Sequence, residues 1–369
     1  MTTDIIEKIT PYVIPAEPIE EQWWARKAYV LVRVETREGV IGWGECHLLT
    51  FRENSIVAMI KRLAEWIVGR PVHNIRDIAQ DMFNNFGQRR PSVEVYSAFA
   101  GIEIALWDIL GKQFNAPIYQ LLGGACHKVL PVYANMYSPG THPPEAYADV
   151  AANMVAMGHS RIKLYPFTAQ TTIEEGIAIL EAVHDVVGPD VGLAVDLWGH
   201  ANPARALQLA RAMEPYDLLW IEDPFAPTDA ASIRYLRDAM TQPLLTGETL
   251  PTRREFVELF ERRAVDVINP DICLSGILEI LAIASLAEVV NISLSPHNSN
   301  SMALGTSAAI HASAGIRNLG PIEYFPLFES ALDDVCNGRV QVVSGEVSIP
   351  ELPGLGVIFD DDAMTRYQV

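Results

Sequence analysis

The chain has 369 residues, of which 49% are hydrophobic, and it carries a formal net charge of −19. This length exceeds one small domain and suits a barrel of about 250 residues with roughly 100 residues left over. The acidic charge argues against a nucleic-acid-binding surface, but an anionic small substrate stays possible because a metal ion and a lysine can reverse the field locally.

No apolar run reaches the roughly 18 residues expected of a membrane span. The opening sequence, MTTDIIEKIT, lacks the basic and then apolar pattern of a secretory signal. The four cysteines are widely separated and lack the spacing of a metal finger. We therefore expect a cytoplasmic protein with reduced thiols and with neither a membrane nor a nucleic acid as partner.

Residues 1–125 have the pattern of an α+β domain. Strand-like stretches at 28–36 and 40–44 flank a turn at 37–39, which predicts a hairpin. Apolar residues recur with helical spacing at 55–68 and 93–114. Two consecutive glycines then interrupt the helical pattern, so the first domain is predicted to end at residue 125.

From residue 126 to 329, short apolar stretches alternate with helical patterns. Strands are predicted at 130–135, 161–165, 191–196, 217–222, 243–248, 264–269, 291–295 and 319–324. Helices are predicted near 144–157, 173–187, 202–214, 228–240, 253–262, 276–289 and 303–313. Strands that alternate with helices imply a parallel sheet, and this many strands imply a closed barrel.

The remaining residues, 330–369, contain strand-like stretches at 340–343 and 346–349 and a Pro/Gly-rich end. We expect this tail to return to the first domain. The predicted fold is therefore α/β, a modified (β/α)7β TIM barrel whose N-terminal α+β domain is completed by the C-terminal tail.

A ladder of polar residues ends successive predicted strands at intervals of 33, 26, 26, 23, 26 and 26 residues: Lys163, Asp196, Glu222, Glu248, Asp271, His297 and Glu323. One strand, one helix and two loops occupy about that length. Barrels of this type keep their chemistry at the carboxyl ends of the strands. The spacing therefore predicts that these side chains converge.

Asp196, Glu222 and Glu248 end three consecutive strands, so their carboxylates should meet at neighbouring points. Three hard oxygen ligands without Cys or His favour Mg²⁺, or Mn²⁺, over zinc. Asp223 follows directly and should point the other way, which gives it a supporting role at most.

Asp271 and His297 end adjacent strands and are predicted to form an acid–base pair. An aspartate that is hydrogen-bonded to one imidazole nitrogen fixes the tautomer and raises the basicity of the other nitrogen. Lys163 at the barrel mouth could hold a substrate carboxylate or, with a lowered pKa, act as a base.

These residues lie within strings that resemble the enolase superfamily in its mandelate racemase-like branch, the mandelate racemase/muconate lactonizing enzyme family. The strings are GIEIALWDILGK (101–112), LLGG (121–124), WIEDP (220–224), LLTGET (244–249), INPDICLSGI (268–277) and SPHNSN (295–300). Their order matches along essentially the whole chain, with residues 1–125 in the place of the capping domain.

The resemblance implies metal-assisted removal of the proton α to a carboxylate, with a Lys or His base and Mg²⁺. It implies that Asp196, Glu222 and Glu248 bind the metal and that Asp271 and His297 form the dyad. It also implies that Glu323 hydrogen-bonds the substrate and that the protein is a symmetric homo-oligomer. Trp23, Trp24 and His47 lie where capping loops of the family close over the barrel mouth, so they are candidates for substrate binding.

Two positions depart from the family pattern. The branch commonly carries Lys-x-Lys on the second strand, whereas this chain has Lys163-Leu164-Tyr165. Some sugar-acid dehydratases of the branch place a second histidine where this chain has Trp198. His200 could reach the mouth from the loop, and Tyr165 or Lys163 could supply a second acid or base.

A racemase needs a base on each face of the α-carbon, and only His297 fits that role clearly. The departures therefore favour a lyase, a Mg²⁺-dependent dehydratase that converts a small-molecule carboxylate, an aldonate or aldarate, into a 2-keto-3-deoxy acid. A cycloisomerase or epimerase of a sugar acid or its lactone remains an alternative. A non-catalytic homologue that uses the fold for binding is the alternative from another class.

Overall fold

The computed structural model describes residues 4–15, 28–47, 51–89, 91–136, 143–299, 301–326, 335–338 and 340–369. Three antiparallel strands form the sheet of the N-terminal domain: β1 (Ile6–Pro15), β2 (Ala28–Thr36) and β3 (Ile41–Cys46). The predicted hairpin at 28–44 is confirmed, since β2 and β3 pair antiparallel across the turn after Thr36. Helices follow this sheet: α1 (Glu53–Ile67), α2 (Ile75–Met82), the π-helix η2 (Phe83–Gly87), α3 (Val93–Gln113) and α4 (Ile118–Leu121).

Helix α3 packs closely on β3 because β3 carries glycines on the contact face. A Cβ atom at Gly44 would lie 1.9 Å from the carbonyl oxygen of Gly101, and one at Gly42 would lie 2.1 Å from that of Ala105. Any larger residue would therefore separate the helix from the sheet. This contact fixes the position of α3, which also packs against the barrel through α10 and α11.

Eight parallel strands form the barrel: β4 (Val129–Asn135), β5 (Arg161–Leu164), β6 (Gly192–Asp196), β7 (Ile221–Glu222), β8 (Leu244–Thr246), β9 (Val267–Ile268), β10 (Ser293–Leu294) and β11 (Ile322–Tyr324). They pair in sequence order from β4 to β10, and β11 pairs with β4. A parallel bridge between Leu294 and Leu319 completes the ring. The predicted barrel is therefore confirmed.

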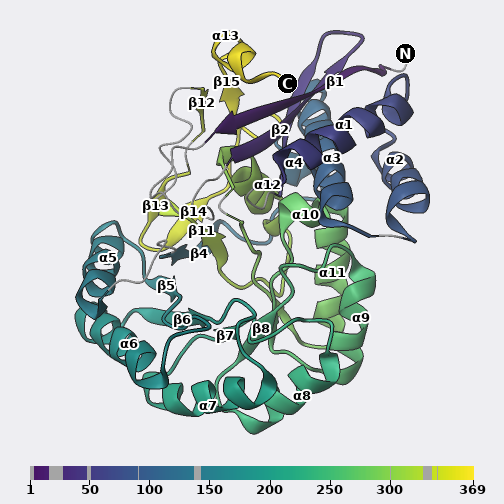
Figure 1. Ribbon diagram of the computed structural model, residues 1–369. Helices are drawn as coiled ribbons and strands as arrows, with labels where there is room; N and C mark the ends of the chain where they lie inside the picture. Colours follow the sequence, from purple (N-terminus) through teal and green to yellow (C-terminus); the bar gives the residue numbers. More distant parts are fainter. Residues whose placement is uncertain are drawn as a thin grey trace.

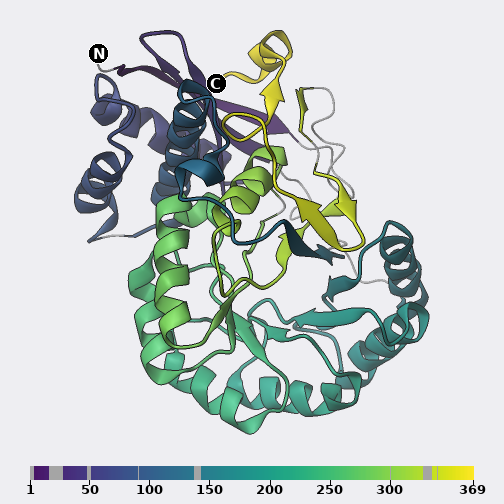
Figure 2. The same cartoon turned by 180° about the vertical axis from the view of Figure 1, so that it is seen from behind.

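The helices that follow these strands form an arc around them, which Figure 1 and Figure 2 show from opposite sides. They are α5 (Pro144–Ala156), α6 (Ile173–Val187), α7 (Pro203–Met213) with η3 (Glu214–Tyr216), α8 (Ala230–Ala239), α9 (Arg253–Arg262), α10 (Ile272–Ser275), α11 (Ile277–Val289) and α12 (Ala303–Ser313). The short helix α10 was not predicted, because four residues are too few to show a helical period.

The predicted strands are longer than the observed ladders. The apolar stretch at 264–269, for example, contains only the two paired residues of β9. Ala264 and Val265 are nevertheless 0% and 1% exposed. The apolar stretch therefore predicted which residues are buried in the core. Only part of the stretch forms the hydrogen bonds of the parallel sheet.

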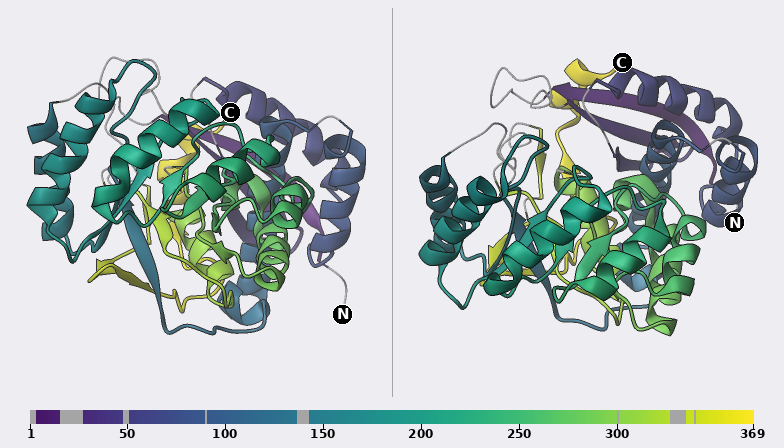
Figure 3. Two further views of the ribbon diagram at one scale, coloured as in Figure 1. Left: turned by 90° about the horizontal axis from the view of Figure 1, so that it is seen from below. Right: turned by 60° about the horizontal axis from the view of Figure 1, so that its bottom comes forward.

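The tail contacts both the barrel and the N-terminal domain, and Figure 3 shows it between them in yellow. Its elements are β12 (Cys336–Asn337), β13 (Val342–Val343), β14 (Glu346–Ser348), β15 (Ile358–Phe359), α13 (Asp361–Met364) and η5 (Thr365–Tyr367). Strand β14 pairs antiparallel with β4 of the barrel. Phe359 stacks on Trp43 at 4.6 Å, and the backbone N–H of Val369 donates to Pro11. These contacts support the predicted return of the tail; the domain limits at residues 125 and 329 stay predictions, and residue 329 lies outside the described residues.

Among the described residues, none of the helices combines the length and the apolar character that crossing a lipid bilayer requires.

Candidate active site

The carboxyl ends of the barrel strands, here called the rim, carry the whole polar ladder. Asp196 and Glu222 end β6 and β7 and are direct register partners. Asp271 and His297 follow β9 and β10 and form a parallel bridge with each other. The predicted convergence therefore occurs because neighbouring parallel strands end at the same edge.

Three carboxylates of the rim are placed to hold one metal ion. One oxygen atom from each of Asp196, Glu222 and Glu248 lies within 4.8 Å of the other two. Asp196 and Glu222 are only 2% and 0% exposed. Burial raises the pKa of Glu222 to about 8 despite the nearby Lys163 ammonium, and the Asp196 carboxylate adds to this increase. Such crowded oxygen ligands suit a hard divalent cation.

Lys163 is a fully buried cation that contacts three rim carboxylates. Its Nζ lies 2.7 Å from Glu222 Oε1, 2.7 Å from Glu323 Oε1 and 3.2 Å from Asp196 Oδ2. Burial alone would lower the pKa of Lys163, but the attraction of Glu222 and Glu323 outweighs it and raises this pKa well above its usual value. These contacts with carboxylates favour the protonated form of Lys163.

The dyad has the predicted geometry. His297 Nδ1 lies 2.7 Å from Asp271 Oδ2, which also accepts the backbone N–H of Ser299 at 3.0 Å. The other oxygen, Oδ1, caps α10 by accepting the N–H groups of Cys273 and Leu274 at 2.8 and 3.1 Å. These bonds fix the orientation of the carboxylate and hence that of the imidazole ring.

The second imidazole nitrogen faces the rim. His297 Nε2 lies 2.9 Å from Glu248 Oε2 and 3.4 Å from Glu323 Oε2. Burial lowers the pKa of His297, but these two carboxylates and Asp271 raise it well above its usual value. Burial raises the pKa of Glu248, yet the charge of His297 outweighs this and lowers it to about 2.

Glu323 lies between the lysine and the histidine. Its Oε1 atom contacts Lys163, whereas Oε2 accepts the backbone N–H of Asn298 at 2.9 Å and lies near His297. The Oε1 atom also accepts a hydrogen bond of 2.7 Å from Asn135. A group bound over the rim would therefore meet this carboxylate, a cation and an imidazole together.

Tyr165 lies directly after β5 at the edge of the rim. Its hydroxyl accepts a hydrogen bond of 2.7 Å from Asn135. Burial raises the pKa of Tyr165 well above its usual value, and Lys163 only partly offsets this. Tyr165 also lines a cavity of about 630 Å³ that includes Tyr147, Thr168 and Glu175.

The other sequence candidates are placed less centrally. Trp23 and Trp24 lie outside the described residues. His47, at the end of β3, approaches the dyad, with its Nδ1 3.3 Å from Asp271 Oδ2. Trp198 donates its backbone N–H to Asp196 at 2.8 Å, but its side chain is 50% exposed and packs edge-on against the exposed ring of His200.

Three further rim residues were missed by the sequence reasoning. The side chain of Asn135 donates hydrogen bonds to Glu323 and Tyr165. Glu222 accepts hydrogen bonds from Asn269 at 3.1 Å and from Trp220 at 3.0 Å. Asn135 ends the first predicted barrel strand, so the position of the ladder itself could have identified it. Asn269 likewise follows a ladder strand, β9, whereas Trp220 directly precedes β7.

Asp223, next to Glu222, is not among the three carboxylates that group as a metal site. It accepts a short hydrogen bond from the Thr246 hydroxyl. Burial and then the charge of Glu248 raise the pKa of Asp223 well above its usual value.

Comparisons with known proteins identify the family. Residues 6–123 match the mandelate racemase/muconate lactonizing enzyme N-terminal domain, and residues 146–363 match the enolase C-terminal domain-like family. The chain therefore belongs to the mandelate racemase/muconate lactonizing enzyme family of the enolase superfamily, as the sequence predicted.

Individual relatives match along most of both chains. The chain is 30% identical to a D-xylonate dehydratase of Haloferax volcanii, over 92% of this chain and 85% of the relative. It is 29% identical to a D-galactarolactone cycloisomerase of Agrobacterium fabrum, over 93% and 92% of the two chains. An enolase structure from environmental sequencing of the Sargasso Sea superposes with a TM-score of 0.92 at 26% identity, over 99% of this chain and 97% of that chain.

Proposed function

We propose that this protein removes the proton α to the carboxylate of a sugar acid, with Mg²⁺ or Mn²⁺, and dehydrates it to a 2-keto-3-deoxy acid. The observation that carries this proposal is the position of His297. One ring nitrogen is held by Asp271, and the other lies 2.9 Å from Glu248, whose carboxylate is grouped with those of Asp196 and Glu222. A base next to a cation site is the arrangement that this proton transfer requires.

In the proposed mechanism, Asp196, Glu222 and Glu248 hold the metal ion. A divalent cation there supplies positive charge for the substrate carboxylate, which becomes more negative when the α-proton leaves. Lys163 adds a second positive charge at the same place, and Glu323 accepts a hydrogen bond from the substrate or its protonated carboxylate. His297 Nε2 takes the α-proton while Asp271 stabilises the resulting imidazolium.

Dehydration then needs an acid for the departing β-hydroxyl, not a second base. The hydroxyl leaves as water after accepting a proton from imidazolium His297 or from Tyr165. The resulting enol becomes the 2-keto acid by losing its hydroxyl proton and gaining a proton at the β-carbon. Lys163 is enclosed by three carboxylates, and Tyr165 stands where the branch commonly carries a second lysine. The chain thus offers one base, which favours dehydration over two-base racemisation.

A cycloisomerase also needs only one abstracted proton, and the similarity to a D-galactarolactone cycloisomerase supports it as the second candidate. A screen of mono- and diacid sugars with Mg²⁺ separates the candidates. The dehydratase yields a 2-keto acid that reacts with semicarbazide, whereas the cycloisomerase yields an isomer of unchanged mass.

The same screen in D₂O tests the common chemical step. Exchange of the substrate α-proton should require both Mg²⁺ and His297. If no sugar acid were to exchange or turn over, and no Mg²⁺ were bound, the non-catalytic alternative would replace this proposal.

Two further expectations remain proposals. We propose a symmetric homo-oligomer, which light scattering of the purified protein would test. We also propose a cytoplasmic location, which cell fractionation would test.

A further inference from the structure

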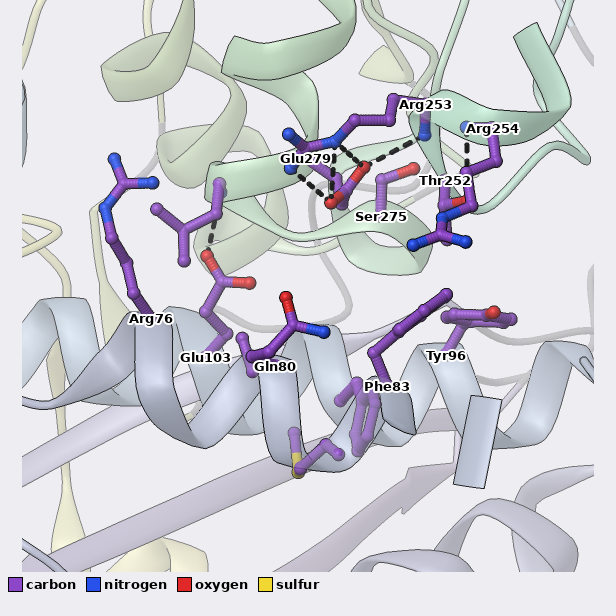
Figure 4. Close-up of a pocket in the computed structure, with 14 residues that line it drawn as sticks. Arg76, Gln80, Phe83, Tyr96, Glu103, Thr252, Arg253, Arg254, Ser275 and Glu279 are labelled. Carbon is purple, nitrogen blue, oxygen red and sulfur yellow. Dashed lines mark hydrogen bonds and ion pairs between the residues drawn. The ribbon is translucent and has the colours of Figure 1, made fainter. Parts of the chain in front are cut away.

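A second cavity lies between the N-terminal domain and the barrel and shares no lining residue with the rim. It measures about 400 Å³. Helices α2, η2 and α3 form one wall, and the start of α9, the end of α10 and the start of α11 form the other (Figure 4). Cavities of this size at a domain boundary commonly hold small molecules.

The lining of the cavity includes arginine side chains that form no ion pair with the described residues. Within the described part of the chain, Arg76 and Arg254 have no carboxylate within ion-pair distance. Arg254 lies instead over the ring of Phe83, 4.5 Å from its centre. Arg253 is already paired, because its guanidinium contacts Glu279 at 2.5 Å. Figure 4 shows Arg76 and Arg254 at opposite ends of the cavity, so either could receive an anionic group from a ligand.

The deep part of the cavity has polar atoms without partners. Glu103 is 7% exposed, and its Oε1 accepts the N–H groups of Leu278 and Trp107 at 2.8 and 3.3 Å. No donor among the described residues reaches its Oε2 atom, which points into the cavity in Figure 4. Ser275 is 8% exposed, and its buried hydroxyl has no hydrogen-bond partner. Buried polar atoms are usually paired, so the Ser275 hydroxyl indicates a missing partner, and Glu103 Oε2 is an acceptor that a ligand could use.

The rest of the lining is apolar and includes Met82, Phe99 and Leu278. A phosphate alone would bring negative charge against Glu103, and an organic cation would be repelled by the arginines. A molecule that carries a carboxylate at one end and hydroxyl donors along its chain satisfies both groups. We propose that this cavity binds a hydroxylated organic acid, with its carboxylate on Arg254 and a hydroxyl donating to Glu103 Oε2.

The cavity is connected to the dyad through four residues of helix. Ser275 is the last residue of α10, and Asp271 is the residue that caps the start of α10. The backbone N–H of His47 also donates to the carbonyl of Cys273 within α10, at 3.0 Å. A ligand that holds Ser275 and Glu103 together would therefore stabilise the segment that orients Asp271 and His47.

The binding is tested by calorimetry with D-gluconate on the full chain in EDTA, with hexanoate as the matched acid that lacks hydroxyls. Gluconate should bind saturably, and hexanoate at least about tenfold more weakly. Arg254→Met and Glu103→Gln should each weaken gluconate binding roughly tenfold or more, since hydrogen bonds to charged groups are worth that much. Arg211→Met on α7 is the control and should bind normally.

The variant Lys163→Met distinguishes binding in the cavity from binding at the rim. It removes a rim cation and should leave the Arg254-dependent binding of gluconate in place. The proposal is overturned if gluconate binding does not depend on Arg254 and Glu103, or if hexanoate binds equally well. Since no turnover is measured, this result is independent of the proposed function.

Hydrogen–deuterium exchange tests the connection to the dyad. Gluconate should slow exchange at the amides of Cys273, Leu274 and Leu278 in the wild type but much less in Arg254→Met. Equal slowing in both proteins would assign the effect to the rim and refute the connection through α10.

Discussion

Two groups of buried carboxylates in this protein differ in what they face. At the rim, Asp196, Glu222 and Glu248 face one another across less than 5 Å, and they depend on cations. Between the two domains, Glu45, Glu103 and Asp108 each accept backbone N–H groups, and Asp108 also pairs with Lys112 at 2.7 Å. Burial of an acidic residue therefore does not by itself indicate a functional site. The groups that surround its carboxylate oxygens indicate whether its role is catalytic or structural.

The acids between the domains join them. Both oxygens of Glu45, on β3, accept N–H groups at the start of α12, from Met302 at 2.8 Å and Gly305 at 2.9 Å. Asp108, on α3, accepts the N–H groups of Trp43 and of Leu355 in the tail. Each carboxylate thus ties segments that are distant in sequence, and the position of His47 over the dyad depends on this docking.

The largest expected effect at the rim is that of His297→Asn. Asparagine can still donate to Asp271 but cannot take a proton, so α-proton exchange in D₂O should fall by about 10²–10⁴-fold. Mg²⁺ affinity should persist, because no ligand is removed. His159→Asn is the matched control, since His159 is also buried but lies before β5, at the opposite end of the strand. Full exchange of the α-proton in His297→Asn would show that another residue is the base.

Removing one charge from the metal-binding group should have the next largest effect. In Glu248→Gln the amide oxygen can still accept from His297, so the fold is retained while a charged ligand is lost. Mg²⁺ affinity, measured by calorimetry, should fall by at least about 10–100-fold. Mutating a residue that only hydrogen-bonds to a metal ligand already lowers metal affinity by about this factor. Unchanged Mg²⁺ affinity would show that the three carboxylates are not the metal site.

The rim was largely predictable from the sequence because strand and helix lengths repeat. The interval of 26 residues between Asp196 and Glu222, and again to Glu248, places each acid at the same end of a strand. Asn135 ends the predicted strand before Lys163 and so fits the ladder, but the sequence does not show its contact with Glu323.

The acids between the domains could not be predicted. Glu103 and Asp108 lie on α3, which the sequence predicted only as a helix with regularly spaced apolar residues. In the structure α3 is covered by the sheet on one side and the barrel on the other, so Glu103 is 7% and Asp108 is 1% exposed. Which acids become buried depends on how the domains dock, and local spacing carries no information about docking.

Glu103 provides a test through pH. Burial raises its pKa from 4.5 to about 7 in the folded protein, while the N–H of Leu278 opposes this. The folded state then binds a proton more tightly than the unfolded chain, so the stability from Glu103 is present at low pH and is lost as pH rises through about 7. Glutamine does not titrate.

The free energy of unfolding of Glu103→Gln should therefore rise relative to the wild type by up to about 3 kcal/mol between pH 5 and pH 8. Urea unfolding at the two pH values measures this change. Glu181→Gln, at an exposed position on α6, is the control and should show no such difference. A constant difference across this range would mean that Glu103 stays ionised in the folded protein.

Glu45→Gln should destabilise the protein without affecting the metal site. Glutamine offers one acceptor oxygen in place of two, and its NH₂ group would face the N–H of Met302 or of Gly305. An unsatisfied buried donor costs about 1–3 kcal/mol, so urea unfolding should show a loss of that size. Mg²⁺ affinity should match that of the wild type, in contrast to Glu248→Gln. If Glu45→Gln lost Mg²⁺ affinity as well, the two groups of carboxylates would be coupled through domain docking, and the separation between structural and metal-binding acids would no longer hold.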